Sequence, residues 1–522
     1  MFKYVVVDGQ KSKHIGQKIA LTCKLVKTCG IKQPYYGLKY PHVKAIFITI
    51  IIAPLLSKDN TMRRLIDYHL IAWKANPYRK SLLLHGARQV GKTYAIRQLG
   101  ASFDNFIEVN FEVHPKLKIL FEQDLDPKRI LRDLCTAIGA KLPVAGTTLI
   151  FFDEIQAAPQ AIIALRYFYE IMPELHVVAA GSLLDFSIEQ VGVPVGRVQS
   201  LYMHPMSFIE YLVALGHQRA ADAILNHDYH QEISTVIHDK LIGLFGHYTA
   251  LGGMPEVVDV WRNTQDLFQC AAIHQSLLSS YRQDFYKYAK QKQVQHLRAL
   301  FDNIPLQLGK KFKYSEVEGD YRSRELSPGL DLLCTADVAQ KVWYSAGPSL
   351  CPDVASADRQ GIPLGAQKRL DDFKVISLDV GLSQATLGLQ LGDWFLQPAT
   401  AFVNKGEHVE ALIGQELLAY TDPIYDAELY YWHRHKVGGE AEIDYLIQEN
   451  EFIIPIEVKS GKGTTLKSMH VFLENHPESP YGIKFSTQNY SVYQNIRSVP
   501  LYAVASSFLS KKRAAFEHVV SL

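Results

Sequence analysis

The stretch SLLLHGARQVGKTYAIRQL, residues Ser81–Leu99, decides the fold of the first half of this chain. An apolar run of strand type leads into a glycine-containing turn, and the turn leads into a segment with helical spacing of apolar residues. Within it, Gly86, Gly91, Lys92 and Thr93 match the pattern G-x-x-x-x-G-K-[ST]. This pattern is expected by chance in roughly 2 of 100 chains of this length. Its strand–turn–helix context therefore predicts a loop that binds phosphate groups.

Each residue type in this loop has a physical reason. Glycines let the backbone curl so that several N–H groups face one phosphate, and a helix that begins near Lys92 adds the positive end of its dipole. We expect Lys92 to reach the β- and γ-phosphates of ATP and the Thr93 hydroxyl to bind Mg²⁺. The predicted nucleotide-binding residues are Gly86, Ala87, Arg88, Gln89, Val90, Gly91, Lys92, Thr93 and Tyr94.

A second apolar strand, TTLIFFDEIQ at residues 147–156, ends in Asp153 and Glu154. It resembles a Walker B strand, in which Asp153 would hold Mg²⁺ and Glu154 would polarise the attacking water. An acid pair at the end of a strand is common by itself. Its place downstream of the loop, in the order strand–loop–helix then buried strand, favours the catalytic interpretation.

Two further polar residues are candidates for the same site. Ser182 ends the third apolar strand, LHVVAAGSLLDF at residues 175–186, and is expected either to sense the γ-phosphate or to cap the next helix. Arg197 lies in GRVQSLYMHPMSFIEYL, residues 196–212. It is expected to act as an arginine finger, in cis or from a neighbouring subunit, or else to form a surface salt bridge.

The stretches GARQVGKT, FFDEIQ, AAGSLL and GRVQSLYMHPMSFIEYL together resemble the prokaryotic AAA-superfamily ATPases that carry a C-terminal domain of unknown function. YTALGGMPEVV, YRQDFYKYA, KFKYSEVEGDYRSREL and FKVISLDVGL are also similar to that family. The resemblance covers about residues 62–480. It implies an α/β fold with a P-loop NTPase parallel sheet, a helical lid, and a C-terminal α/β domain of restriction-endonuclease-like type.

A second pair of strands is predicted in EIDYLIQENEFIIPIEVKSG, residues 442–461. With a turn at 448–451, simple pairing sets Glu442 opposite Glu457 and Asp444 one diagonal step away, and a bulge would exchange those roles. Alternation places Glu457 and Lys459 on one face of their strand. Several acids and one lysine therefore converge on a small area of sheet.

Like charges placed so closely are destabilising without a cation. The cluster therefore predicts a divalent metal bound by Asp444 and Glu457, with Lys459 positioning a water or a phosphate. The spacing is similar to the D…ExK signature of restriction-like nucleases. In that resemblance Glu416 matches the acid of the first helix, and His433, Arg434 and His435 would lie nearby. An exposed Lys–Glu pair on a strand face would give the same pattern.

Composition and charge limit the remaining interpretations. The chain has 522 residues and 48% apolar residues, which predicts two to four globular domains. Six scattered cysteines indicate a reducing, cytoplasmic location without a disulfide framework. Residues 1–61 hold ten lysines and two acids. That segment carries a charge of +8, so the rest carries −6 of the net +2, which excludes a globally basic nucleic-acid binder.

The apolar run Ala45–Leu56 is too short to span a bilayer, which needs about 20 helical residues, so no integral membrane anchor is expected. It is either a buried or interfacial segment, or synthesis begins at Met62 and the extension is not native. Within residues 291–345, five cations near a predicted turn and helix either contact DNA phosphates or, because nearby acids cancel their charge, belong to a protein-binding or spacer module. Those cations are Lys310, Lys311, Lys313, Arg322 and Arg324.

The predicted organisation is a basic N-terminal extension (1–61), an AAA-type P-loop ATPase domain (62–212), a helical lid (213–290), a winged-helix-like module (291–345), a linker (346–370) and a restriction-endonuclease-like domain (371–522). The expected function is hydrolysis of ATP with Mg²⁺, coupled to a nuclease-like domain directed at DNA, with nuclease activity itself left open. Two alternatives remain: a nucleotide-dependent switch that only binds nucleic acid or protein, and a homo-oligomeric ATPase that remodels a protein partner.

Overall fold

The computed structural model describes residues 62–192, 196–346, 363–436, 439–461 and 466–509. The basic extension at residues 1–61 and most of the predicted linker at 346–370 lie outside the described residues. All elements below belong to one unit of the chain, which runs from Ile50 to Leu522.

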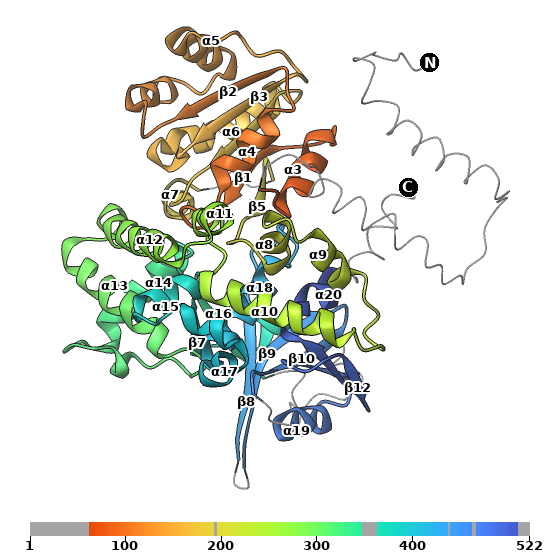
Figure 1. Cartoon of the computed structure of the whole chain (residues 1–522). Coiled ribbons are helices and arrows are strands. Elements are labelled where there is room, and N and C mark those ends of the chain that lie inside the picture. The colour runs from red at the N-terminus through yellow and green to blue at the C-terminus, as the bar shows by residue number, and fades with distance from the viewer. Residues whose placement is uncertain (1–61, 193–195, 347–362, 437–438, 462–465, 510–522) are drawn as a thin grey trace, which may run out of the picture. The chain divides into compact units, whose positions relative to one another are not determined.

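The first sheet has five parallel strands in the order β2-β3-β4-β1-β5 (Figure 1). Central strands of such a sheet are covered on both faces and therefore read as continuous apolar runs, as β1, β3 and β4 do. This confirms the predicted parallel sheet of a P-loop fold. The strands are β1 (Ser81–His85), β2 (Asn105–Asn110), β3 (Thr148–Asp153), β4 (His176–Ala180) and β5 (Val198–Tyr202).

Helices cover both faces of this sheet. Alternate residues of the strands belong to two cores: one includes Leu82 and Phe151 with α3 and α4, and the other includes Leu83 and Phe152 with α5 and α6. The strand order brings the carboxyl ends of β3, β4 and β1 side by side, which is where parallel α/β sheets bind ligands. The helices are α3 (Ile66–Ala75), α4 (Lys92–Gly100), α5 (Pro127–Ile138), α6 (Pro159–Ile171) and α7 (Leu184–Val191).

The middle of the chain is helical, as the spacing of apolar residues over 213–290 predicts. Gly252 and Pro255 separate two of these helices. Gly252 has a φ of +74°, in the region that favours glycine, and Pro255 is the first residue of the next helix. The helices are α8 (Phe208–Ala214), α9 (Gln218–Leu225), α10 (Thr235–Leu251), α11 (Pro255–Thr264), α12 (Leu267–Tyr288), α13 (Gln291–Asn303) and α14 (Ser323–Thr335).

The predicted winged-helix-like module (291–345) ends in a strand that does not form a local wing but belongs to the second sheet of the protein. β6 (Ala339–Ser345) pairs antiparallel with β7 (Lys368–Ser377) and parallel with β8 (Leu429–Lys436). The structure thus differs from the predicted division, because the boundaries at 345 and 371 separate strands that share hydrogen bonds. A short apolar strand needs partners on its edges, and β6 finds them far along the chain instead of in a local hairpin.

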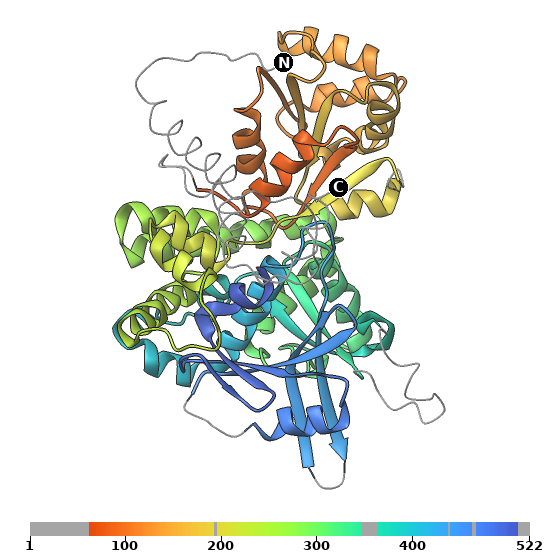
Figure 2. The same ribbon diagram turned by 90° about the vertical axis from the view of Figure 1, so that its right-hand side faces the viewer.

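The second sheet has eight strands in the order β12-β13-β11-β10-β9-β8-β6-β7. Figures 1 and 2 show β8 and β9 as a long hairpin that extends past the other strands. α18 packs with Ile454 and Ile456 in one core, and α19 packs with Ile443 and Ile453 in another. The remaining elements are β9 (Gly439–Glu449), β10 (Phe452–Lys459), β11 (Gly482–Ser486), β12 (Ser491–Tyr493), β13 (Ile496–Pro500), α15 (Val380–Thr386), α16 (Gly392–Leu396), α17 (Pro398–Asn404), α18 (Gly406–Ala419), α19 (Lys467–Asn475) and α20 (Val504–Leu509).

The turn between β9 and β10 differs from the sequence prediction. Glu449 pairs with Phe452, so the turn holds only Asn450 and Glu451 in place of the four residues expected. Asn450 has a φ of +54°, and two-residue hairpin turns favour asparagine at such positions. The ladder ends with Tyr445 opposite Ile456. Its continuation therefore sets Asp444 beside Glu457. This is the exchanged arrangement that was predicted for a bulge, and the simple pairing of Glu442 with Glu457 is wrong.

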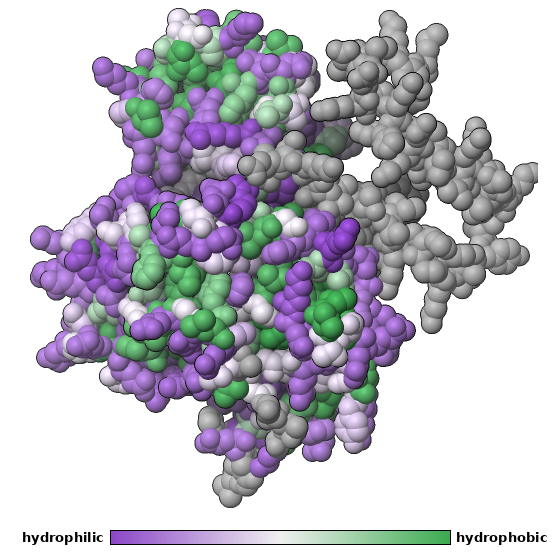
Figure 3. Space-filling view, in the orientation of Figure 1, coloured by the Kyte–Doolittle hydropathy of each residue, from purple (hydrophilic) through white to green (hydrophobic). Residues whose placement is uncertain are grey.

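One face of the molecule is mostly polar. In Figure 3 hydrophilic side chains predominate on the visible face, and apolar side chains form separate patches. Among the helices of the described residues, none combines the length and the apolar character that a bilayer-spanning segment requires.

Candidate nucleotide site and a second ionic cluster

The phosphate-binding loop lies between the end of β1 at His85 and the start of α4 at Lys92. Gly86 has a φ of +130° and Gly91 a φ of +102°, a region of backbone conformation that favours glycine. A Cβ on Gly86 would lie 2.2 Å from the backbone oxygen of Met203. The first glycine of the motif is therefore required by both conformation and space.

Lys92 points back into the loop that precedes it. Its Nζ donates to the backbone oxygens of Gly86 at 2.5 Å and of Ala87 at 2.7 Å. Burial lowers the pKa of Lys92 to about 8, although the charges of Glu154 and Asp337 oppose that shift. A bound phosphate would favour the charged ammonium. Lys92 is thus held at the place where an anion in the loop would need a cation.

Thr93 and Asp153 meet at the carboxyl end of β3. The Thr93 hydroxyl donates to the two carboxylate oxygens at 3.3 and 3.4 Å, and Asn110 Nδ2 donates to Oδ2 at 3.0 Å. Burial, together with the neighbouring Glu154, raises the pKa of Asp153. A hydroxyl beside a carboxylate is a donor set that suits Mg²⁺. Asn110 was not predicted, although it ends the strand that neighbours β3.

Glu154 adopts an uncommon backbone conformation directly after β3. Its φ is +50°, which is costly for a residue other than glycine and occurs often at functional sites. Its Oε2 accepts from Gln156 Nε2 at 2.5 Å and from Ser182 Oγ at 3.5 Å. The structure therefore brings the predicted catalytic acid and the predicted γ-phosphate sensor together.

Arg197 does not join these residues in the described chain. Its Nε donates to Glu170 Oε1 at 2.7 Å, and its side chain is about half exposed. This geometry matches the salt-bridge alternative. A role as an arginine finger toward a neighbouring subunit stays a prediction.

Residues from beyond the ATPase segment also reach the phosphate-binding loop. Arg88 of the loop forms an ion pair with Asp284 of α12, and Tyr281 donates to the Arg88 backbone oxygen. Asp337, just before β6, lines a pocket together with Ala87, and burial raises the pKa of its carboxyl to about 7. These contacts were not predicted, because the sequence places them some 200 residues from the loop.

The second cluster lies where β9 and β10 meet. Asp444 Oδ2 accepts from the backbone N–H of Val458 at 2.7 Å, and Lys459 Nζ lies 2.5 Å from Glu457 Oε1. Glu457 is buried, and its Oε2 has no hydrogen-bond partner among the described residues. Burial, with the nearby charge of Glu410, raises the pKa of Asp444 well above its usual range. The structure thus brings together Asp444, Glu457 and Lys459.

Glu416 does not contribute to this cluster. It is buried elsewhere, and its Oε1 accepts from the backbone N–H of Phe208 at 2.9 Å and from the Tyr248 hydroxyl at 2.8 Å. The helix acid near Asp444 is Glu410, whose carboxylate lies 2.9 Å from Lys374 Nζ. Six residues along an α-helix correspond to a rotation of about 240°, so Glu410 and Glu416 face different ways.

Other predicted neighbours of the cluster have different partners. His433 Nε2 lies 3.0 Å from Asp372 Oδ2, Arg434 Nη1 donates to Asn475 at 3.4 Å, and the side chain of His435 lies outside the described residues. Lys374 also lies 2.5 Å from Glu442. Within the described ranges, no group of three or more His, Cys, Asp or Glu side chains is arranged to hold a metal ion.

Three family models match consecutive parts of the chain. Residues 78–212 match an AAA domain. Residues 242–392 match a domain of unknown function (DUF8612), and residues 405–504 match another (DUF4143). Among curated proteins, no sequence matches this chain.

Several solved structures are similar to the chain at low identity. A Walker-type ATPase of Pyrococcus abyssi is 13% identical over 63% of this chain and 97% of that one, with a TM-score of 0.38. The Orc1 protein of Aeropyrum pernix, in complex with DNA, is 12% identical over 67% and 93%, with a TM-score of 0.25. Drosophila ORC bound to DNA is 11% identical over 72% and 99%, with a TM-score of 0.23.

The family matches and the loop geometry agree. Residues 78–212 form an AAA-type P-loop ATPase domain, which is followed by two segments that match domains of unknown function.

Proposed function

We propose that this protein binds ATP with Mg²⁺ and hydrolyses it at the carboxyl edge of the five-stranded sheet. One observation carries the proposal. Lys92 in the loop, the Thr93–Asp153 pair and the Glu154–Ser182 pair converge at the ends of three neighbouring strands. A phosphate-binding cation, an oxygen donor set for Mg²⁺ and a carboxylate for the attacking water are the parts that phosphoryl transfer requires.

Each residue has a distinct role in this proposal. Lys92 neutralises charge on the β- and γ-phosphates, and Thr93 and Asp153 would hold Mg²⁺, directly or through water. Glu154 accepts the proton of the attacking water, and Ser182 fixes the orientation of that carboxylate. Bound Mg²⁺ would neutralise charge that develops on the phosphate oxygens.

Two substitutions separate binding from chemistry. Lys92→Ala should lower ATP affinity by about 100-fold, whereas Glu154→Gln should keep ATP affinity and lower turnover by about 100-fold or more. Matched controls are Lys128→Ala, exposed in the first turn of α5, and Glu174→Gln, in an exposed loop. Nucleotide titration and phosphate release would measure both. Unchanged turnover in Glu154→Gln would contradict the proposed role of that residue.

We propose as a second function that the eight-stranded domain acts on DNA and that ATP turnover is coupled to it. The supporting observation is the buried Oε2 of Glu457, which has no hydrogen-bond partner in the described part of the chain and lies beside Asp444 and Lys459. Two carboxylates with a lysine next to them form a donor set that would hold one divalent cation against a phosphodiester. Its resemblance to the D…ExK signature supports the same class of reaction.

A nicking assay with Mg²⁺ or Mn²⁺ tests this second function. Nicking should disappear in Glu457→Gln and in Lys459→Ala while ATP turnover survives. Salt-dependent DNA binding without cleavage would favour the nucleotide-dependent switch. ATP turnover that responds to a protein and not to DNA would favour a remodelling ATPase with a docking scaffold, acting alone or as a homo-oligomer.

A further inference from the structure

The C-terminal two turns of α12 contact the phosphate-binding loop through both its backbone and a side chain. The Tyr281 hydroxyl donates to the backbone oxygen of Arg88 at 2.5 Å. Arg88 Nη1 donates to both carboxylate oxygens of Asp284, with 2.6 Å to Oδ2. This helix lies in the segment that matches a domain of unknown function. It therefore takes part in the architecture of the nucleotide site.

The same helix touches two other parts of the ATPase domain. Lys287 Nζ lies 3.0 Å from Glu112, which follows β2. The ring of Tyr288 stacks on Phe186 with 4.8 Å between centroids, and Phe186 follows the sensor residue Ser182 by four positions. α12 thus contacts the loop, the turn after β2 and the helix after β4.

Arg88 is placed where its environment depends on the nucleotide. Its side chain is 33% exposed, whereas Asp284 is 10% exposed. Burial disfavours the charged guanidinium, but Asp284, Glu154 and Glu112 hold the pKa of Arg88 above its ordinary value. A triphosphate in the loop would bring further negative charge close to the same guanidinium, and arginine binds phosphate oxygens as readily as carboxylates.

We infer that α12 senses the γ-phosphate of ATP, because Arg88 exchanges its partner from the Asp284 carboxylate to a γ-phosphate oxygen. This inference rests on the proposed function. Asp284 keeps a second cation after the exchange, since Lys287 Nζ lies 3.6 Å away on the next turn of the helix. The contact therefore has two arrangements with satisfied charges, and ATP selects one of them because only ATP carries the third phosphate.

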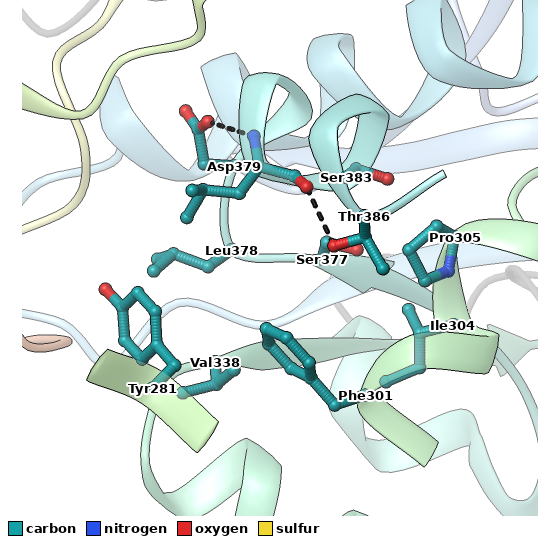
Figure 4. Close-up of a pocket in the computed structure, with 11 residues that line it drawn as sticks. Tyr281, Phe301, Ile304, Pro305, Val338, Ser377, Leu378, Asp379, Ser383 and Thr386 are labelled. Carbon is teal, nitrogen blue, oxygen red and sulfur yellow. Dashed lines mark hydrogen bonds between the residues drawn. The ribbon is translucent and has the colours of Figure 1, made fainter. Parts of the chain in front are cut away.

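A displacement of α12 would reach the eight-stranded sheet through the ring of Tyr281. Figure 4 shows this ring in a pocket between helices and the first strands of that sheet. Val338 precedes β6 and Ser377 ends β7. Both residues line the pocket together with Tyr281. The residue that holds the loop backbone therefore also packs against the beginning of the second domain.

Equilibrium binding of ATP and ADP, measured with Mg²⁺, tests the exchange. Asp284→Asn should bind ATP about five- to tenfold more tightly than the wild type, because Arg88 no longer has to leave an anionic partner. Its ADP affinity should stay unchanged. Arg88→Ala should lose the preference for ATP over ADP, and Asp284→Asn in that background should add nothing. Asp284→Glu, which restores the charge, should restore the wild-type ratio.

Asp302→Asn is the matched control. Asp302 lies in α13, and the substitution breaks its 2.7 Å ion pair with Arg282 of α12 without touching the loop. If Asp284→Asn shifts ATP and ADP equally, or if Asp302→Asn reproduces its effect, the inference is overturned. Because binding and not turnover is measured, ATP binding without hydrolysis would contradict the proposed ATPase function and leave the exchange intact.

Discussion

Two buried lysines show how differently the two ionic clusters of this protein are built. Lys92 in the nucleotide loop has backbone oxygens as its hydrogen-bond partners, and burial lowers its pKa to about 8. Lys374 in the eight-stranded sheet is buried at least as deeply, but its partners are carboxylates. Although burial by itself lowers the pKa of Lys374, Glu410, Asp444 and Glu442 raise it above the ordinary value.

This difference indicates which of the two clusters would bind a charged ligand more strongly. In the nucleotide loop, neutral groups hold the charges of Lys92 and Asp153, so a phosphate and a cation would each improve the electrostatic balance. In the second cluster, Lys374 and Lys459 already neutralise the acids, and a metal ion would have to compete with ammonium groups. The loop therefore suits the proposed ligand, ATP with Mg²⁺, whereas the acidic cluster would take a cation only weakly.

The largest change in stability is expected when the buried cation Lys374 is removed. Lys374→Met removes the cation between Glu410 and Glu442, so the free energy of unfolding should fall by about 3 kcal/mol, because buried charge is left uncompensated. Urea denaturation measures this. Lys313→Met, which removes an exposed pair with Glu316, should cost less than about 1 kcal/mol. Equal losses in the two variants would show that Lys374 is not the neutralising group.

Glu416 is a buried acid whose hydrogen-bond donors are neutral, in contrast to the acids that pair with Lys374. Burial raises its pKa to about 7 from the ordinary value of 4.5. The fold thus favours the protonated form, and this stabilisation is complete below pH 4.5 and is lost as the pH rises through about 7. The wild type should lose roughly 2 kcal/mol relative to Glu416→Gln between those values.

Denaturation of both proteins at pH 4.5, 6 and 8 measures this difference. Other acids titrate in both, so their contribution cancels. Parallel stability curves would mean that Glu416 is ionised in the fold, and Tyr248 would then be its principal stabiliser.

The smallest expected effect concerns metal binding at the second cluster. Lys459→Ala removes an ammonium that lies on Glu457, so Mn²⁺ should bind that cluster about threefold to tenfold more tightly than in the wild type. Nicking of DNA should nevertheless be lost. Calorimetric titration without nucleotide measures the affinity, and Glu457→Gln is the control that should abolish it. Weaker Mn²⁺ binding in Lys459→Ala would contradict competition between the lysine and the metal.

The nucleotide site could be predicted because its information is local. Strand, glycine turn and helix follow one another within Ser81–Leu99, and the apolar strands that end at Asp153 and shortly before Ser182 are continuous in sequence. Parallel sheets place such strand ends at one edge. The partners of Arg88 could not be predicted, because Asp284 lies far along the chain and reaches the loop only through the packing of helices.

The members Asp444, Glu457 and Lys459 of the second cluster could be predicted, but the strand register and the acid from the helix could not. A two-residue turn at Asn450 in place of four shifts the register and exchanges Glu442 for Asp444. The helix of Glu410 and Glu416 offers two acids on different faces, and only tertiary packing selects between them. β6 shows the same limit, since its composition predicts a strand but not its partners.

Neutral groups hold the charges of Lys92 and Asp153, and we propose that these two charges receive ATP with Mg²⁺. The most direct test is the free energy of unfolding of the wild type and Lys92→Met, each with and without saturating ATP and Mg²⁺. Without ligand the two should agree within about 1 kcal/mol, because the hydrogen-bond partners of Lys92 are backbone oxygens and not carboxylates. Ligand at 100 times its Kd should stabilise the wild type by about 2.7 kcal/mol and the variant hardly at all. Equal stabilisation of both proteins by ATP would contradict the account.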